Sequence, residues 1–328
     1  MTEYVTIGHP DRIADLLAAK LIEAIQRKDQ WDAHAAIEVL ITGNKVVFSG
    51  EARTSLKLTK KFLKNEIVIP VLNDCGYEER GDFSKSQKII SSEYKVINLI
   101  QSQSPDIKEA VFGENNDLVK WNDQGIFYAG YDPRTETGQS KEKFLAQKIG
   151  DYLFEAAKKN PKLGTDIKVL INNNEITVAI PSLLGEDITK KMVEVLICQN
   201  PVYLSDFIKT DNVVIKVNTS GKYVSHGSIA DTGLTGRKLA VNSLSPINQN
   251  GGGSMIKPVR SADLLVPLFL FNRAKKVALT SKEEVNLEAC CEIGKDTLPG
   301  YIGITPKQII EENDLLNNFY SLVKRNFV

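Results

Sequence analysis

The sequence predicts an α+β fold made of three similar units, each a small sheet covered on one face by helices. Two observations lead to this expectation. An order of helix, paired strands and helix recurs three times along the 328 residues at roughly even separation. The composition, with 42% hydrophobic and 25% charged residues, is that of a globular chain with sizeable cores. Residue identity between the rounds is slight, so the alternative is that a common order recurs by chance.

The first round starts at Pro10, a residue that suits the first turn of a helix. Apolar residues then recur at the helical period, and two strand-like runs follow across a Thr42-Gly43-Asn44 turn. In order, we expect a helix at 10–27, strands at 36–41 and 45–49, a helix at 55–65, a strand at 67–71, a helix at 141–158, strands at 168–172 and 175–180, helices at 186–198 and 260–276, strands near 285–293 and 300–304, and a helix at 306–324.

These rounds divide the chain into an N-terminal unit over 1–102, a central unit over 123–224 and a C-terminal unit over 225–328, with segments free to interleave. A polar stretch near 101–131 separates the first two units and shows no sustained period. Loops of that length inside a compact chain are usually lids or linkers. We favour a lid, because aromatic residues and Asp123-Gln124-Gly125 flank the stretch.

Charge and cysteine usage exclude several function classes. Lys+Arg and Asp+Glu balance at 41 each, which favours a small-molecule partner over nucleic acid. The most apolar run, 264–271, is too short to cross a bilayer, and the N-terminus lacks an export signature. Four cysteines without Cys-x-x-Cys spacing indicate reduced thiols in the cytoplasm, and only three histidines disfavour a histidine-rich zinc site.

The stretch Asp231-Thr232-Gly233-Leu234-Thr235-Gly236-Arg237-Lys238 combines an acid, two glycines and two adjacent cations, and Gly251-Gly252-Gly253 and Lys257 follow it. Glycine lets the backbone approach a ligand closely, and adjacent Arg and Lys suit a polyphosphate. The acid suits a metal ion or the ammonium of a second substrate. The alternative is a solvated loop, because short glycine motifs are weak signals. A P-loop motif is absent from the sequence, which disfavours ordinary kinase chemistry.

Gly8-His9-Pro10-Asp11 sets an imidazole and a carboxylate at a helix start, where the dipole attracts anions. Beside a polyphosphate, this pair suggests a metal-binding acid and a hydrogen-bond donor to a leaving oxygen. The alternatives are a stabilised first turn and a surface histidine. Glu38 interrupts an apolar strand, so it either binds a cation or lies on a wet face.

Three further positions add to this set. Glu51 stands at a strand end, where ligands often bind. Asp166 and Lys168 alternate onto one face of the second pair of strands. Tyr223 suits stacking on an adenine, or simple packing.

With these residues in place, the sequence resembles the S-adenosylmethionine synthetases, or methionine adenosyltransferases. The matching motifs run in order from residue 3 to about 262, so no single short motif carries the resemblance. They are Gly8-His9-Pro10-Asp11 with Ile13-Ala14-Asp15, Gly50-Glu51, Gln103-Ser104-Pro105-Asp106-Ile107, Asp123-Gln124-Gly125, Asp231 to Lys238, and Gly251-Gly252-Gly253.

The resemblance implies an ATP-consuming alkyl transfer. The thioether sulfur of methionine attacks C5′ of ATP and displaces triphosphate, which is then cleaved to phosphate and pyrophosphate. A thioether has no proton to lose, so alignment and stabilisation of the leaving charge supply the catalysis. The family fold is three related α+β domains in a pseudo-threefold arrangement, with a mobile gate that corresponds to residues 103–122. Its active sites lie between subunits of a homodimer, often paired into tetramers, and it uses Mg²⁺ and K⁺.

The resemblance also assigns roles to residues. For ATP and its triphosphate, the assigned residues are Glu3, His9, Asp166, Lys168, Tyr223, Asp231, Arg237, Lys238 and Ser254. For methionine, they are Glu51, Gln103, Asp123, Asp231 and Lys257, and for metals Asp11 (Mg²⁺) and Glu38 (K⁺). The expected catalytic set is His9, Lys168, Arg237, Lys238 and Lys257.

The chain departs from the family pattern after Gly253, where the family has two lysines and an Asp before an Arg-Ser. Here only Lys257 precedes Arg260-Ser261, so a lysine and a Mg²⁺ ligand lack counterparts, and Asp263 is our candidate replacement for the ligand. The chain is also several dozen residues shorter than typical members. We expect an active, divergent synthetase; the alternatives are a tripolyphosphatase and a nucleotide-binding subunit with weak or lost adenosyl transfer.

Overall fold

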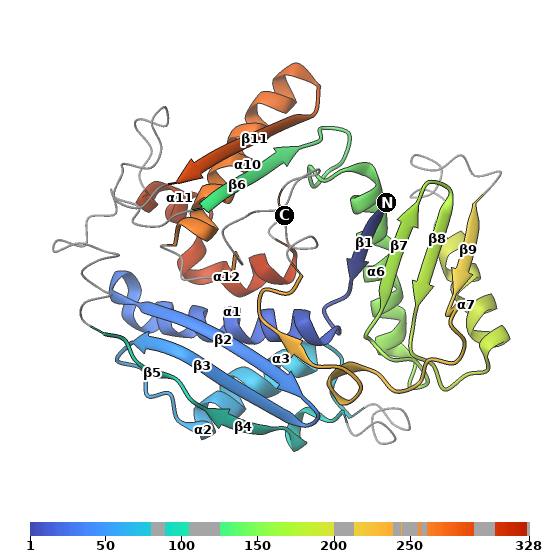
Figure 1. Cartoon of the computed structure of the whole chain (residues 1–328), viewed down its shortest axis with the longest axis horizontal. Helices are drawn as coiled ribbons and strands as arrows, with labels where there is room; N and C mark the ends of the chain where they lie inside the picture. The colour runs from blue at the N-terminus through green and yellow to red at the C-terminus, as the bar shows by residue number, and fades with distance from the viewer. Residues whose placement is uncertain are drawn as a thin grey trace.

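The computed structural model describes residues 1–79, 89–104, 125–199, 213–238, 244, 255–256, 261–291 and 306–326. Three β-sheets, each with its own helices, surround a centre where the C-terminal segment lies (Figure 1). The predicted α+β class with three units is therefore confirmed.

The first sheet is built on a hairpin of β2 (His34–Thr42) and β3 (Lys45–Arg53), which turns at Gly43 with φ 54°. Alternate residues of β2 are buried beneath α1 (Pro10–Asp29), the helix that the apolar period predicts. The remaining strands give the order β10-β2-β3-β4, with β5 also on β3; they are β10 (Gly233–Leu234), β4 (Lys95–Asn98) and β5 (Gln101–Ser102).

The second sheet has the order β1-β7-β8-β9 and takes its first strand from the start of the chain. Its strands are β1 (Thr2–Val5), β7 (Lys168–Asn172), β8 (Glu175–Ala179) and β9 (Val214–Val217). The helix α6 (Lys141–Lys159), capped by the Ser140 side chain, packs on β1 and β7, and α7 (Glu186–Cys198) packs on β9. Because β1 belongs here and α1 to the first sheet, the link between them crosses from one unit to the other.

The third sheet pairs β6 (Gly125–Tyr131) with β11 (Val285–Cys291), and α10 (Ala262–Ser281) packs against both. The chain ends in α11 (Pro306–Glu312) and α12 (Leu315–Lys324), which packs on α1. Strands thus cross the expected division, since β10 joins the first sheet and β6 the third. Among the helices of the described ranges, none combines the length and apolar composition needed to span a bilayer.

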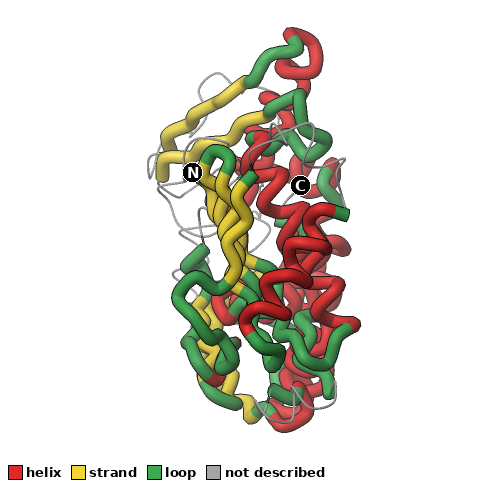
Figure 2. Tube along the Cα trace, turned by 90° about the vertical axis from the view of Figure 1, so that its right-hand side faces the viewer, coloured by secondary structure: helices red, strands yellow, loops and turns green. Residues whose placement is uncertain are grey.

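Strands and helices form two layers, with the sheets on one side of the molecule and the helices on the other (Figure 2). The core lies between the layers, so none of the described helices covers the side chains on the outer faces of the sheets. On the first sheet these include a straight aliphatic row across four strands, paired in register: Leu234, Leu40, Val47 and Ile97. Ile97 and Leu234 are 36% and 38% exposed.

Three predicted elements differ from the structure. The predicted strand at 67–71 is wrong: the backbone runs as α2 (Lys60–Phe62), a π-helix (Leu63–Val68) and α3 (Ile69–Asp74). The buried residues there, Leu63, Ile67, Val68, Val71 and Leu72, share one helical face, and its packing outweighs the strand propensity of the apolar run. The helix expected at 55–65 starts only at Lys60, and the helix expected at 306–324 is divided at Asp314, where φ is 46°. The strand expected at 300–304 lies outside the described residues.

Candidate active site

The candidate site begins at the start of α1, where the local sequence caps the helix. The Nδ1 atom of His9 accepts the Asp11 N–H at 3.2 Å, and Pro10 occupies the first turn. Gly8 lies so close to Thr165 that a Cβ would be 2.3 Å from the Thr165 carbonyl oxygen, which explains glycine at this position. The start of α1 is thus fixed against the segment that leads into β7.

The 231–238 segment lies across this helix start and is held from two sides. On the α1 side, Gly233 approaches so closely that a Cβ would be 2.1 Å from the Pro10 carbonyl oxygen. On the β2 side, the Thr235 N–H donates to the Val39 carbonyl at 3.1 Å, and the Thr235 hydroxyl accepts the Val39 N–H at 3.2 Å. The backbone of the segment therefore packs between the first helix and the first sheet.

Two carboxylates one turn apart on α1 also bind the backbone of the 231–238 segment. Asp11 accepts the Leu234 N–H at 3.0 Å, and Asp15 accepts the Gly236 N–H at 2.9 Å. Gly236 has φ 76°, a backbone conformation that favours glycine. The two adjacent cations of the motif follow this turn directly, so the turn sets where they begin.

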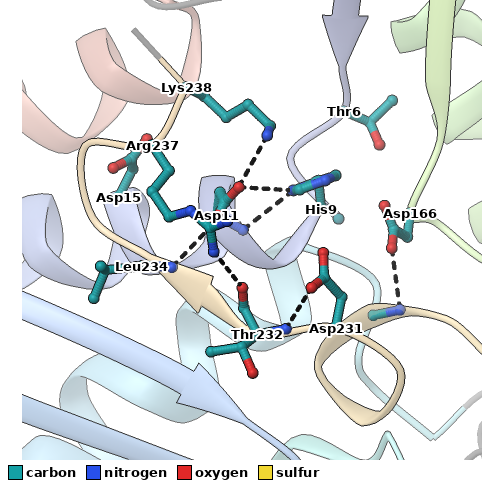
Figure 3. A network of polar contacts seen from close by, with 12 residues as sticks. Thr6, His9, Asp11, Asp15, Asp166, Asp231, Thr232, Leu234, Arg237 and Lys238 are labelled. Atoms are coloured by element: carbon teal, nitrogen blue, oxygen red, sulfur yellow. Dashed lines mark hydrogen bonds and ion pairs between the residues drawn. The ribbon is translucent and has the colours of Figure 1, made fainter.

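Both cations meet Asp11 (Figure 3). Lys238 Nζ lies 2.9 Å from Asp11 Oδ2, and the Arg237 guanidinium lies 3.7 Å from Asp11 Oδ1. The Asp11 side chain is 3% exposed, whereas those of Lys238 and Arg237 are 20% and 55% exposed. A buried carboxylate thus gathers two partly exposed cations at the positive end of a helix, an arrangement that suits a polyanionic ligand.

His9 is held neutral. Burial, followed by the positive charges of Lys238 and Lys168, lowers the pKa of the imidazole from 6.5 to about 3. A neutral ring carries one hydrogen, and Nδ1 accepts the Asp11 N–H, so the hydrogen resides on Nε2. His9 therefore offers an N–H donor near neutral pH without carrying charge.

Asp166 forms the second part of the site. It is 4% exposed, and its Oδ2 accepts the Gly227 N–H at 3.1 Å and the Tyr223 hydroxyl at 3.3 Å. Among the described residues, its Oδ1 has no hydrogen-bond partner. Burial raises the pKa of Asp166 to about 6. A buried acceptor oxygen without a partner marks a position where a ligand hydroxyl would be bound.

The other predicted nucleotide residues lie around this centre. Lys168 is exposed on β7, and its charge acts on both His9 and Asp166. Asp231 is exposed, and its charge also acts on both. Glu3 is exposed on β1, paired in register with Leu170. The residues predicted from distant parts of the chain are therefore brought together.

The predicted methionine residues lie elsewhere on the chain. Gln103 Nε2 donates to Glu51 at 3.1 Å, so these two do contact each other. Glu51, however, stands opposite Ala36 in β2, whereas Gly233 stands opposite Ile41. At about 3.3 Å per residue, this separates the strand positions of Glu51 and Gly233 by about 17 Å. Within one chain, Glu51 and Gln103 therefore lie away from the strand positions at which the 231–238 segment joins the first sheet.

Glu38 is exposed on the outer face of β2, so the cost of a buried carboxylate does not apply to the single chain. The Thr235 hydroxyl donates to it. Asp263 is buried in the first turn of α10, and within the described ranges no contact joins it to Asp11. Predicted site residues Asp123, Ser254 and Lys257, with most of the expected gate, lie outside the described residues.

The residues at Asp11 fit a metal ion that binds phosphate at the same time. Magnesium is usually held by one or two carboxylates together with substrate phosphates. Asp11 supplies a buried carboxylate, and the Lys238 ammonium already lies against it as a cation. Across the described ranges no group of three or more His, Cys, Asp or Glu side chains could bind a metal without such help.

The sequence interpretation missed functional contacts of Asp15, Thr235 and Gly227. Asp15 carries a signal that could have identified it, because it lies four residues after Asp11 and so on the same helix face. The role of Gly227, whose N–H meets Asp166, depends on a contact across 61 residues and has no local signature.

Known proteins share this organisation. Residues 1–105 match the family model of the S-adenosylmethionine synthetase N-terminal domain. The chain is 29% identical to the S-adenosylmethionine synthase of Petrotoga mobilis, over 99% of this chain and 86% of that protein. It is 26% identical to that of Helicobacter pylori, over 98% and 90%. A solved structure, described as an unusual S-adenosylmethionine synthetase from Campylobacter jejuni, matches with a TM-score of 0.83 at 26% identity, over 100% of this chain and 94% of that one.

The fold and site describe a class: a three-unit α+β protein whose first helix starts beside a cluster of cations and buried carboxylates that suits a polyanion. In sequence and fold, the chain is similar to the S-adenosylmethionine synthetases. The similarity is distant, at 26–29% identity, and these relatives extend beyond the length that the chain matches.

Proposed function

We propose that this chain synthesises S-adenosylmethionine from ATP and L-methionine and cleaves the displaced tripolyphosphate to phosphate and pyrophosphate. By its similarity to these synthetases, the chain is a methionine adenosyltransferase. The observation that carries the proposal is the cluster at the α1 start, where Arg237 and Lys238 converge on buried Asp11 beside neutral His9.

The cluster suits stabilisation of a leaving triphosphate. As the sulfur attacks C5′, the C5′–O bond breaks and negative charge grows on the bridging oxygen and the polyphosphate. Lys238, Arg237 and Lys168 would bind that charge, and the Nε2–H of His9 would donate to the oxygen. The sulfur needs no base, because a thioether has no proton and becomes a sulfonium directly.

The nucleoside would bind beside Asp166. Its open Oδ1 suits a ribose hydroxyl, while Gly227 and Tyr223 hold Oδ2 in place. Tyr223 is partly exposed, which leaves ring surface for stacking on adenine. Ser254 and Glu3 complete the proposed ATP contacts.

The proposal includes two kinds of metal ion. Asp11 would bind Mg²⁺, with Asp263 as a further Mg²⁺ ligand, and Glu38 would bind K⁺. The family is metal-dependent in general, and bound Mg²⁺ would neutralise phosphate charge. Asp11 must then release Lys238, because one carboxylate oxygen cannot bind the ammonium and the metal together. We infer that Lys238 turns from Asp11 to the triphosphate as the ligand binds.

The methionine residues require a second subunit. Glu51 and Gln103, with Asp123, Asp231 and Lys257, are proposed to bind methionine, yet Glu51 lies about 17 Å along the strand from Gly233, which precedes the two cations in the 231–238 segment. Two chains packed antiparallel through their first sheets would bring Glu51 of one near Lys238 of the other. We therefore propose a homodimer with sites at the interface, possible also as a dimer of dimers.

The uncovered face of the first sheet fits such an interface. The aliphatic row Leu234, Leu40, Val47 and Ile97 crosses it in register, and rows with Glu38 and Glu51 lie beside it. Burying an aliphatic strip against its copy removes apolar surface from water. The free thiols of Cys75, Cys198 and Cys290 support our placing the protein in the reducing cytoplasm.

One assay tests the function. Purified protein is incubated with ATP, methionine, Mg²⁺ and K⁺, and sulfonium product, phosphate and pyrophosphate are measured together. The proposal expects the three products in equal amounts, with none of the sulfonium when methionine is omitted. Phosphate release from tripolyphosphate without sulfonium product would instead identify a tripolyphosphatase. Nucleotide binding without either product would identify a binding subunit.

A further inference from the structure

We propose that Asp15 is a positioning residue for the Arg237-Lys238 pair: by accepting the Gly236 N–H, it fixes the turn from which both cations extend. The identity of the anion that the cations bind rests on the function proposed above. The role of Asp15 in placing them rests on geometry alone.

Asp15 is fully buried in the second turn of α1, and its Oδ1 lies 2.9 Å from the Gly236 nitrogen. Gly236 is the residue immediately before Arg237, and its φ of 76° turns the chain there. A buried carboxylate bound to a backbone N–H forms a strong, charge-assisted hydrogen bond. The direction in which the two cations leave the backbone therefore depends on this contact.

Asp15 and Asp11 have different roles in the site. Asp11 binds the Leu234 N–H and also the ammonium of Lys238, so its ion pairs change when ligand and metal arrive. Asp15 binds the turn itself, where substrate charge has no reason to displace it. The segment thus keeps one fixed anchor while the cations exchange partners, which keeps Lys238 within reach of an incoming phosphate.

The experiment measures binding of inorganic tripolyphosphate with Mg²⁺ by calorimetry, together with amide hydrogen exchange of the peptide that covers 231–238. Asp15→Ala is expected to weaken tripolyphosphate at least tenfold and to speed exchange of that peptide. Asp15→Asn keeps an acceptor oxygen, so affinity within about threefold of the parent is expected. Asp15→Glu retains the charge but displaces the carboxylate, and serves if the alanine variant does not fold.

The matched control is Glu23→Ala. Glu23 is also a buried acid of α1, and it accepts a backbone N–H, that of Tyr320 at 2.8 Å, away from the site. Its loss should lower thermal stability comparably while leaving tripolyphosphate affinity within twofold and exchange of 231–238 unchanged. This separates positioning from general support of the helix.

A combined variant adds a readout that a purely structural role would not move. If Asp15 acts through Arg237 and Lys238, adding Asp15→Ala to a protein that carries both Arg237→Ala and Lys238→Ala should cost less than threefold further affinity, because both positioned groups are already gone. Asp15→Ala with parent affinity and parent exchange would overturn the inference. A parent protein that does not bind tripolyphosphate would contradict the proposed function, while the exchange measurement would still decide the role of Asp15.

Discussion

At the scale of single residues, the site depends on how burial sets charge. His9 stays neutral because burial and two lysines lower its pKa, whereas burial, with a smaller contribution from the negative charge of Asp231, raises the pKa of Asp166. The carboxylate of Asp11 contacts the positively charged groups of both Arg237 and Lys238. The sequence named these residues as site candidates, but the electrostatic state of each depends on neighbours from other segments.

Replacing Lys238 by Ala should reduce turnover by roughly 10²- to 10³-fold, because a contact that strengthens in the transition state is lost. The thermal midpoint should change little, since the lysine is partly exposed. Turnover is measured by steady-state kinetics with ATP and methionine, and the thermal midpoint is measured by a thermal melt. Lys222→Ala, an exposed lysine in the turn after Gly221, is the control and should keep parent kinetics. Equal turnover for the two variants would contradict the phosphate role.

Asp166 predicts a pH dependence of stability. Its pKa rises from 3.8 to about 6 on folding, so the folded state binds the proton more tightly than the unfolded chain. The stabilisation is complete below pH 3.8 and is lost as pH rises through about 6, a change of about 3 kcal/mol.

The check is the free energy of unfolding of parent and Asp166→Asn, measured by denaturant titration between pH 4 and 8. The parent should lose stability relative to the variant as pH rises, and the difference should level off above pH 7. Comparing the two proteins cancels the titration of other groups. A difference that is constant across this range would show that Asp166 has an ordinary pKa.

At the scale of elements, the 231–238 segment works because helix, strand and turn fit closely. Gly233 lies on the first turn of α1, Thr235 bonds to β2, and Asp15 bonds to Gly236. The sequence predicted the motif as the centre of the site and a helix that starts at Pro10. It could not show that the two are packed together, because that contact spans more than 200 residues.

Gly233→Ala should push β10 away from α1, because the new Cβ would lie 2.1 Å from the Pro10 carbonyl oxygen. We expect a loss of about 1–3 kcal/mol in unfolding free energy and at least tenfold in kcat/KM. Gly185→Ala is the control, since nothing lies within 4 Å of its Cβ, and it should cost less than about 1 kcal/mol. Parent-like kinetics for Gly233→Ala would mean that β10 can shift without harm.

The wrong strand prediction at 67–71 belongs to the same scale. Ile67, Val68 and Val71 are apolar and β-branched, which favours a strand locally. They also continue the buried face that begins at Leu63, and the helical backbone buries all of them at once. Local propensity is weak evidence when two periods fit the same residues.

At the scale of the whole molecule, the described sheets lie on one side and the described helices on the other (Figure 2). The proposed dimer predicts complementation between two defective subunits. Mixed dimers of Glu51→Ala and Lys238→Ala would hold one intact site and one doubly altered site. After random reassembly, half of the dimers are mixed, so about a quarter of the parent activity should return.

The measurement is activity after the two variants are unfolded together and refolded, with each variant refolded alone as the control. If every site were built within one chain, mixing would give only the average of the two residual activities. That result would refute the shared site. Sedimentation of the parent at the same concentrations reports the size of the assembly.

The sequence by itself determined the α+β class, the main helices and hairpins, and the resemblance to the S-adenosylmethionine synthetases. These follow from local periodicity, turn chemistry and ordered motifs, which neighbouring residues in the chain encode. Only the tertiary structure decided that β1 joins the second sheet and β10 the first, that Asp15 holds Gly236, and that Glu51 and Gly233 stand at different positions along β2. Those features arise from packing between segments distant in sequence, for which no local pattern of residues exists.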